Sequence, residues 1–413
     1  MKKMLLCLLP LVLIILSNVE QVQGISAVDL SALREIKNSL TDISSSSPNP
    51  FFTTWDFTTS DPCSTFAGIT CSSSIPKRVT TLNLGTGLSD SPGLAGTLSP
   101  AISNLSELTQ LILFTGIVTG PIPSQLGTLK KLSIISLANN RLTGSIPGSI
   151  FSLPNLHTLD LSHNQLTGTI PGSISALSDL KVVILGSNKL SGVIPQLPAE
   201  LLHLDLSNNE FSGMLPKRMP LTLRYLSVLG NSLWGPLNTL ESLSELVYLD
   251  LSMNRFSGPI PTSLFRATLS SMFLQRNNFT GGVPQLPPTS SLYGPGSTVD
   301  LSHNYLTGEL TNTLTGVETL FLNNNMFTGA VPRDYVESVY SGNTKTLYLQ
   351  HNYIAEFPVV EGLALPDSVA LCLSYNCMVP PVPVLEFMAC PASAGDMISR
   401  PVNQCSAFNT SMA

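Results

Sequence analysis

The chain has 413 residues, and only 11% of them are charged, against about 25% in an average soluble protein. The formal net charge is −6 and no cluster of Lys or Arg occurs, so nucleic acid is not an expected partner. The sequence contains no GxSxG, phosphate-loop or HExxH motif, so we expect neither an enzyme nor a bound cofactor.

The first 24 residues have the pattern of a secretory signal peptide. Lys2 and Lys3 precede an apolar run over residues 4–16, and Gly24 follows at a plausible cleavage site. A membrane-spanning helix needs about 20 apolar residues, and this run is shorter. We therefore expect a secreted protein of the extracellular space or cell wall, with no membrane span.

Cysteines outside the signal lie only near the two ends of the chain. They are Cys63, Cys71, Cys372, Cys377, Cys390 and Cys405. An even number in an oxidising compartment predicts disulfides, and the four C-terminal cysteines allow three pairings. No histidine lies near them, so we expect no metal site. Sequons at Asn104, Asn278 and Asn409 predict N-glycosylation.

One phrase recurs through the middle of the chain: LDLSHNQLTGTIP begins at Leu159, LDLSNNEFSGMLP at Leu204 and LDLSMNRFSGPIP at Leu249. Thirteen repeats can be aligned on the Asn of LxxLxLxxN. The anchor positions are Gly87, Gly116, Asn140, Asn164, Asn188, Asn209, Asn231, Asn254, Asn277, Asn304, Asn325, Asn352 and Asn376. A period in the range of about 20–29 residues with this pattern is typical of leucine-rich repeats.

Each part of the repeat has a physical role. Alternation in LxL places both leucines on one side of a short strand, and stacked repeats bury them together. We expect the anchor Asn to turn inward and to satisfy backbone groups of the turn that follows. The predicted fold class is an α/β solenoid, a superhelix with a parallel sheet on its concave face.

The second half of the repeat appears as RLTGSIP, QLTGTIP, KLSGVIP, RFSGPIP and NFTGGVP, and DPCSTFAGITC follows a helical pattern at residues 28–40. These motifs resemble plant extracellular leucine-rich repeat proteins, which include receptor ectodomains and polygalacturonase-inhibiting proteins. The resemblance implies disulfide-bonded caps and a Cys63–Cys71 pair. It also implies an N-terminal cap at 25–78, repeats at 79–368, and an irregular last repeat with a cysteine-containing cap at 369–413.

Function is expected where exposed positions of the repeats differ. Phe273, Phe321 and Tyr348 stand between the two strand leucines, and Tyr225 and Tyr248 stand one place before the first leucine. We expect these five rings to be exposed on the concave face and to bind a partner, because aromatic side chains are enriched at binding hot spots. Gln275 and Arg276 are expected to add polar contacts beside Phe273.

Other departures from the consensus are less specific. Trp234 fills a slot held elsewhere by Thr or Ser, so it should lie on a lateral flank, either packed on a neighbour or touching a partner. Longer steps before Asn304 and Asn352 contain PPTSSLYGPGS and RDYVESVYSGN, which we expect to bulge outward as loops. The five histidines, His157, His163, His203, His303 and His351, fall on predicted strand faces, where an acidic fluid could charge them.

The sequence therefore predicts a secreted recognition protein whose concave face binds a protein, peptide or glycan at the plant cell surface or wall. A receptor kinase ectodomain is among the candidate partners. The alternative is an inhibitor of a wall-degrading hydrolase, similar to polygalacturonase-inhibiting proteins, although those have fewer and more even repeats.

Overall fold

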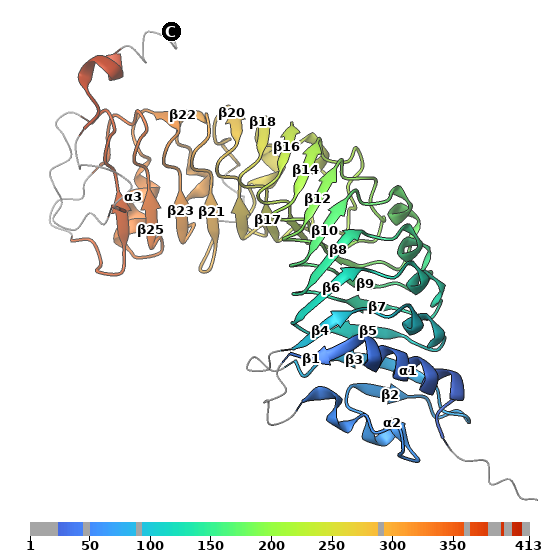
Figure 1. Cartoon of the computed structure of the whole chain (residues 1–413). Helices are drawn as coiled ribbons and strands as arrows, with labels where there is room; N and C mark the ends of the chain where they lie inside the picture. Colours follow the sequence, from blue (N-terminus) through green and yellow to red (C-terminus); the bar gives the residue numbers. More distant parts are fainter. Residues whose placement is uncertain are drawn as a thin grey trace, which may run out of the picture.

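The computed structural model describes residues 24–43, 50–87, 93–287, 293–358, 364–378, 390–391 and 399–406. The repeats stack side by side along an arc that runs from the blue N-terminal end to the orange and red C-terminal end (Figure 1). The predicted signal peptide and the Asn409 sequon lie outside the described residues. Within those residues, no helix combines the length and the apolar character needed to cross a membrane.

The larger sheet holds fourteen strands of the described chain, and thirteen of them come from the predicted LxL segments. Neighbours from β3 onward pair in parallel, whereas β2 pairs with β3 in the antiparallel sense. The strands are β2 (Ile69–Cys71), β3 (Val79–Leu84), β5 (Gln110–Leu113), β7 (Ile134–Ser136), β9 (Thr158–Asp160), β11 (Val182–Ile184), β13 (His203–Asp205), β15 (Tyr225–Ser227), β17 (Tyr248–Asp250), β19 (Ser271–Phe273), β21 (Thr298–Asp300), β23 (Thr319–Phe321), β25 (Thr346–Tyr348) and β26 (Ala370–Cys372). The predicted fold class is confirmed.

A second sheet of ten strands, which the repeat pattern did not predict, is formed mainly by the LxG segments. Its strands are β1 (Leu40–Asp42), β4 (Leu94–Thr97), β6 (Ile117–Pro121), β8 (Arg141–Ser145), β10 (Gln165–Gly168), β12 (Lys189–Gly192), β14 (Glu210–Gly213), β16 (Ser232–Gly235), β18 (Arg255–Pro259) and β20 (Asn278–Thr280). A short pair, β22 (Thr307–Glu309) and β24 (Met326–Thr328), lies farther along the chain. Gly192 shows why these strands contain glycine. Its φ is +81°, which L-residues rarely adopt, and an added Cβ would lie 2.8 Å from Thr169 Cγ2.

Short 3₁₀ helices cover the side of the solenoid away from the concave face in most described repeats. They are η2 (Pro100–Asn104), η3 (Ser124–Thr128), η4 (Gly148–Ser152), η5 (Gly172–Ala176), η6 (Asn238–Leu240), η7 (Thr262–Leu264) and η8 (Asn312–Leu314). The segment RDYVESVYSGN, expected to be a loop, instead forms helix α3 (Arg333–Tyr340) and the turn after it. The loop prediction was wrong because Tyr335, Val336 and Val339 fall on one helical face and are buried in the core.

The anchor asparagines form a continuous ladder beneath the ends of the concave strands. Asn164 donates from Nδ2 to the carbonyls of Leu137, Leu161 and Ser162, and its Oδ1 accepts a 2.9 Å bond from the backbone N–H of Leu142. The same contact to the LxG segment of the preceding repeat recurs at each anchor from Asn140 to Asn376. The inward role predicted for this residue is confirmed.

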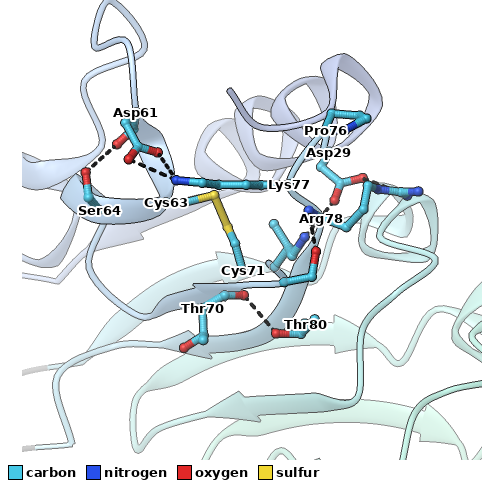
Figure 2. Close-up of a disulfide and its surroundings, with 12 residues drawn as sticks. Asp29, Asp61, Cys63, Ser64, Thr70, Cys71, Pro76, Lys77, Arg78 and Thr80 are labelled. Carbon is cyan, nitrogen blue, oxygen red and sulfur yellow. Dashed lines mark hydrogen bonds and ion pairs between the residues drawn. A yellow bond between two sulfur atoms is a disulfide. The ribbon is translucent and has the colours of Figure 1, made fainter. Parts of the chain in front are cut away.

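The N-terminal cap covers the first edge of the solenoid with α1 (Ala27–Ser39), η1 (Phe51–Thr54) and α2 (Pro62–Thr65). Figure 2 shows the Cys63–Cys71 disulfide, which is the pair that the resemblance implied. Asp29 is fully buried, pairs with the Arg78 guanidinium at 2.9 Å and accepts a 2.8 Å hydrogen bond from the Val79 backbone N–H. This carboxylate therefore ties α1 to the first concave strand.

At the other end, the pairing that the sequence left open is Cys372–Cys390 and Cys377–Cys405. The Arg400 guanidinium lies 4.1 Å from the ring centre of Tyr353 and 4.6 Å from that of Tyr375. Its Nε donates a 3.0 Å hydrogen bond to the Asn352 carbonyl. These contacts hold the described residues 399–406 against the last repeats.

Candidate partner-binding surface on the concave sheet

Six aromatic side chains lie in strands β13 to β25 of the larger sheet, with none in β21, and we call them the aromatic strip. They are His203, Tyr225, Tyr248, Phe273, Phe321 and Tyr348. In each strand the flanking Leu or Met side chain is fully buried, so alternation turns the aromatic side chain to the opposite, concave side. The five rings predicted from sequence are all in the strip, and His203 joins them.

The first part of the strip is a stack of parallel rings. His203, Tyr225 and Tyr248 occupy the same register position in β13, β15 and β17. Their ring centres are 4.0 and 4.3 Å apart, and their planes differ by 3° and 5°. Adjacent strands lie about 4.8 Å apart, so rings at one register position can stack without bending the sheet.

The second part of the strip moves across the sheet. Phe273 is in register with Asp250, not with Tyr248, yet its ring centre lies 5.7 Å from that of Tyr248. Two strands farther on, Phe321 and Tyr348 occupy the same register position as Phe273, and their rings meet edge to face at 5.2 Å. The strip therefore runs obliquely from the start of β13 toward the ends of β19 to β25.

The expectation that these rings are exposed is only partly right, because all six residues are half-buried. The stacked rings of His203, Tyr225 and Tyr248 cover parts of one another's faces, which helps to half-bury them. Arg276 is exposed beside the strip, whereas Gln275 is half-buried and its Oε1 has no hydrogen-bond partner among the described residues. Sequence reasoning missed Gln350, whose buried Oε1 is likewise without a partner there.

The aspartates between the strand leucines have a structural role. Asp160, Asp205, Asp250 and Asp300 each accept a hydrogen bond from the backbone N–H of the serine two residues later. Burial raises the pKa of Asp250 and of Asp300, although these serine contacts oppose the shift. These carboxylates close the ends of the strands and are not gathered into a catalytic pair.

Burial also sets the charge of the strip. It lowers the pKa of His203, although the nearby carboxylates of Asp205 and Asp160 oppose the shift. It raises the pKa of Tyr225 and of Tyr248 well above the neutral range. Near neutral pH the strip is therefore an uncharged aromatic surface.

Other residues singled out from sequence lie away from the strip. Trp234 is in β16 of the second sheet and is 50% exposed, which agrees with a place on the flank. His163, His303 and His351, expected on strand faces, instead lie in the turns after β9, β21 and β25, where each has a positive φ. Asn104 and Asn278 are exposed, so N-glycosylation at both stays a prediction. Across the described ranges, no three His, Cys, Asp or Glu side chains are grouped to hold a metal.

Known sequence families match parts of the chain. The profile described as "Leucine rich repeat N-terminal domain" matches residues 26–72, and "Leucine rich repeat" profiles match residues 130–190, 200–220 and 245–267. No curated protein matches the chain at a significant level.

Solved structures with a similar fold include ectodomains of plant receptors. A TDR receptor is 25% identical with a TM-score of 0.57, and the match covers 69% of this chain and 58% of that one. The ectodomain of the Arabidopsis thaliana membrane receptor kinase GASSHO1/SCHENGEN3, in complex with CASPARIAN STRIP INTEGRITY FACTOR 2, is 27% identical with a TM-score of 0.54, covering 84% of this chain and 50% of that one. The plant peptide hormone receptor RGFR1, solved with RGF2, is 24% identical with a TM-score of 0.51. The match covers 69% of this chain and 54% of that one.

The chain thus spans between half and three fifths of the length of these receptor structures. The match to RGFR1 bears on the fold alone. With two largely parallel sheets, an anchor-asparagine ladder and disulfides near both ends, the chain has the fold of a leucine-rich repeat solenoid, its residues 26–72 match the leucine rich repeat N-terminal domain profile, and its fold is similar to that of plant receptor ectodomains.

Proposed function

We propose that this protein is an extracellular recognition protein that binds an extended polypeptide segment along the aromatic strip. The observation that carries the proposal is the continuity of the strip, in which aromatic side chains from β13 to β19 touch one another across four neighbouring strands. Half-buried aromatic rings offer contact area at a low entropy cost, which is why they dominate binding hot spots. The similar ectodomain solved with CASPARIAN STRIP INTEGRITY FACTOR 2 supports a binding role for this fold.

The arrangement of the rings favours a polypeptide over a glycan. A sugar ring packs best on an open aromatic face, but stacking covers both faces of Tyr225 and one face each of His203 and Tyr248. The ring edges that remain instead suit apolar side chains of an extended chain. The oblique course of the strip predicts that such a chain crosses the strands at an angle.

Secretion into the extracellular space is part of the proposal. The three disulfides support it, because such bonds persist in oxidising compartments. A receptor kinase ectodomain remains a candidate partner, either as the protein bound or as a component recruited with the ligand.

A capture experiment from plant extracellular fluid tests the proposal. It compares wild type with a strip variant that carries Tyr248→Ala, Phe273→Ala, Phe321→Ala and Tyr348→Ala. A matched control carries Trp234→Ala and Tyr305→Ala, two aromatic side chains that are 50% and 53% exposed outside the strip. We expect wild type and control to capture the same polypeptide and the strip variant to lose it.

Because the strip is half-buried, thermal unfolding must show that the variant is folded. A second variant with leucine at the same four positions keeps most of the packing and removes the rings. Equal capture by wild type and both strip variants would contradict the proposal. A captured pectin-degrading hydrolase that loses activity in the complex would replace receptor-type recognition with hydrolase inhibition.

A further inference from the structure

A pocket of about 640 Å³ lies away from the aromatic strip, between repeats that are longer than their neighbours. One wall is formed by residues 293–295 of the first long segment, and the other by α3 and the turn after it, from the second. Asn312, Thr315 and Gly316, at η8 and the turn that follows it, lie between these walls. The volume is within the range of about 300–1,000 Å³ that small-molecule sites occupy. Both departures from the regular repeat length therefore contribute to one pocket.

Helix α3 presents its polar face to this pocket. Asp334, Glu337, Ser338 and Ser341 line it, and their spacing of three, four and seven residues places them on one side of a helix. The Ser338 hydroxyl is hydrogen-bonded to the Thr344 hydroxyl, and the Ser341 hydroxyl donates to the Ser338 carbonyl. The two carboxylates are exposed and are thus the groups that this wall offers to a ligand.

The opposite wall is held in place by hydrogen bonds. The Ser297 hydroxyl donates to the Gly294 carbonyl at 2.6 Å, and the Gly296 backbone N–H donates to the Glu318 carboxylate at 2.8 Å. Lys345 pairs with the same carboxylate at 3.1 Å. Gly316 packs so closely that an added Cβ would lie 2.9 Å from the Tyr293 carbonyl oxygen. The pocket is therefore formed before a ligand arrives, which lowers the entropic cost of binding.

The charge of the pocket is one-sided. Of the described residues that line it, two are carboxylates and none is Lys, Arg or His. Neither Asp334 nor Glu337 forms an ion pair with any described residue. The Thr315 hydroxyl is buried at the pocket and lacks a hydrogen-bond partner within the described chain. Carboxylates are among the acceptors that ammonium and guanidinium groups bind most strongly.

We propose that this pocket binds an organic cation, a primary ammonium or a guanidinium group. The group comes either from a Lys or Arg side chain of a partner protein or from a free polyamine. A neutral sugar fits less well, because Tyr293 is only 6% exposed and offers no open ring face. None of the aromatic-strip residues lines the pocket, so this binding is separate from that on the concave face.

Titration calorimetry at low ionic strength tests the proposal. The probes are Nα-acetyl-arginine methylamide, its uncharged isostere Nα-acetyl-citrulline methylamide, spermidine and the neutral sugar cellobiose. The test variant is Asp334→Asn with Glu337→Gln, which removes both charges and keeps the shapes. The matched control is Glu241→Gln with Glu245→Gln, which removes two exposed carboxylates outside the pocket.

We expect the arginine probe or spermidine to bind wild type and the control, and the double pocket variant to bind about tenfold or more weakly. The citrulline probe should bind wild type weakly as well. Tighter binding of the arginine probe identifies a protein side chain as the source, and tighter binding of spermidine identifies a polyamine. Equal binding of arginine and citrulline probes would overturn the proposal, as would unchanged binding in the pocket variant. Binding of cellobiose alone, or of no probe at all, would overturn it too.

Discussion

The anchor asparagines make one side chain serve two repeats at once. Asn254 donates from Nδ2 to the carbonyls of Val228, Leu251 and Ser252 and accepts from the backbone N–H of Leu233. It is 8% exposed, so water cannot replace these bonds without rearrangement. These bonds explain why asparagine recurs after almost every concave strand.

Replacing Asn254 with Ala should therefore lower the free energy of unfolding by about 1–3 kcal/mol, because buried backbone groups lose their partner. Urea unfolding followed by circular dichroism measures the change. The control is Asn238→Ala, at an exposed position, which should stay within about 0.5 kcal/mol of wild type. Equal, small effects at both sites would show that the ladder contributes little.

His203 predicts a pH dependence of stability with a definite sign. Burial lowers its pKa in the folded state below the unfolded value of about 6.5. The unfolded chain then holds the proton more tightly, so this contribution to stability is complete above about pH 6.5 and is lost as pH falls through the folded-state pKa. Wild type should thus lose stability between pH 7.5 and pH 5 relative to His203→Phe, which keeps an aromatic ring and does not titrate.

The measurement is urea unfolding of both proteins across this pH range, with an NMR titration of the His203 ring. Other titrating groups are common to both proteins and cancel in the difference. Parallel pH profiles for the two proteins, or a ring that titrates at or above pH 6.5, would contradict the assignment.

At the scale of elements, the two sheets differ in how far the sequence predicts them. The LxL alternation predicts the concave strands, because buried leucines at a period of two have one structural solution in a stacked array. The LxG segment does not predict a strand. Glycine disfavours strand conformation, and these strands form only because they pair with the same segment of the neighbouring repeat. Helix α3 was not predicted either, because the extra length of its segment suggests a loop, although its apolar residues have helical spacing.

The second sheet depends on its glycines, and this can be measured. Gly213 has φ of +88°, and an added Cβ would lie 3.0 Å from Val193 Cγ1. Gly213→Ala should therefore lower the free energy of unfolding by about 1–2 kcal/mol, since L-residues are strained in this region. Gly148 has no atom within 4 Å of an added Cβ and no positive φ, so Gly148→Ala should be neutral. Urea unfolding of the two variants measures both free-energy changes. Similar changes for Gly213→Ala and Gly148→Ala would contradict this role of the glycines.

The geometry of the candidate binding surface was predicted in part. Five strip residues could be read from their column in the repeat because the LxL register fixes which side chains face outward. The stacking that half-buries them, and the place of His203 in it, depend on contacts between repeats. The pocket at α3 could not be predicted, since it joins two segments whose conformations differ from the repeat consensus.

At the scale of the whole molecule, stability is set by repeats and by the caps that cover the ends. Figure 2 shows two ion pairs in the N-terminal cap that make a matched comparison. Asp29 is fully buried against Arg78, whereas Asp61 is 37% exposed beside Lys77. The Asp29 carboxylate should contribute far more to the free energy of unfolding than the Asp61 carboxylate. Its removal leaves a partly desolvated guanidinium and an unpaired backbone N–H.

Asp29→Ala should lower the free energy of unfolding by about 3 kcal/mol or more, and Asp61→Ala should lower it by less than about 1 kcal/mol. Hydrogen exchange should localise the loss to the cap and the first repeats, since each repeat contacts only its neighbours. Uniform loss of protection along the solenoid would contradict this account of the cap.

The central claim is that the concave aromatic strip is the partner-binding surface, and site-specific photo-crosslinking tests it most directly. A benzoylphenylalanine is placed at Phe273 in the strip, at Trp234 on the second sheet, or at Asn343 beside the α3 pocket. Each protein is irradiated in plant extracellular fluid, and the adducts are identified by mass spectrometry. The account predicts a discrete polypeptide adduct at position 273 that is absent at position 234, whereas position 343 reports separately on the α3 pocket. An adduct at position 234 with none at position 273 would contradict it.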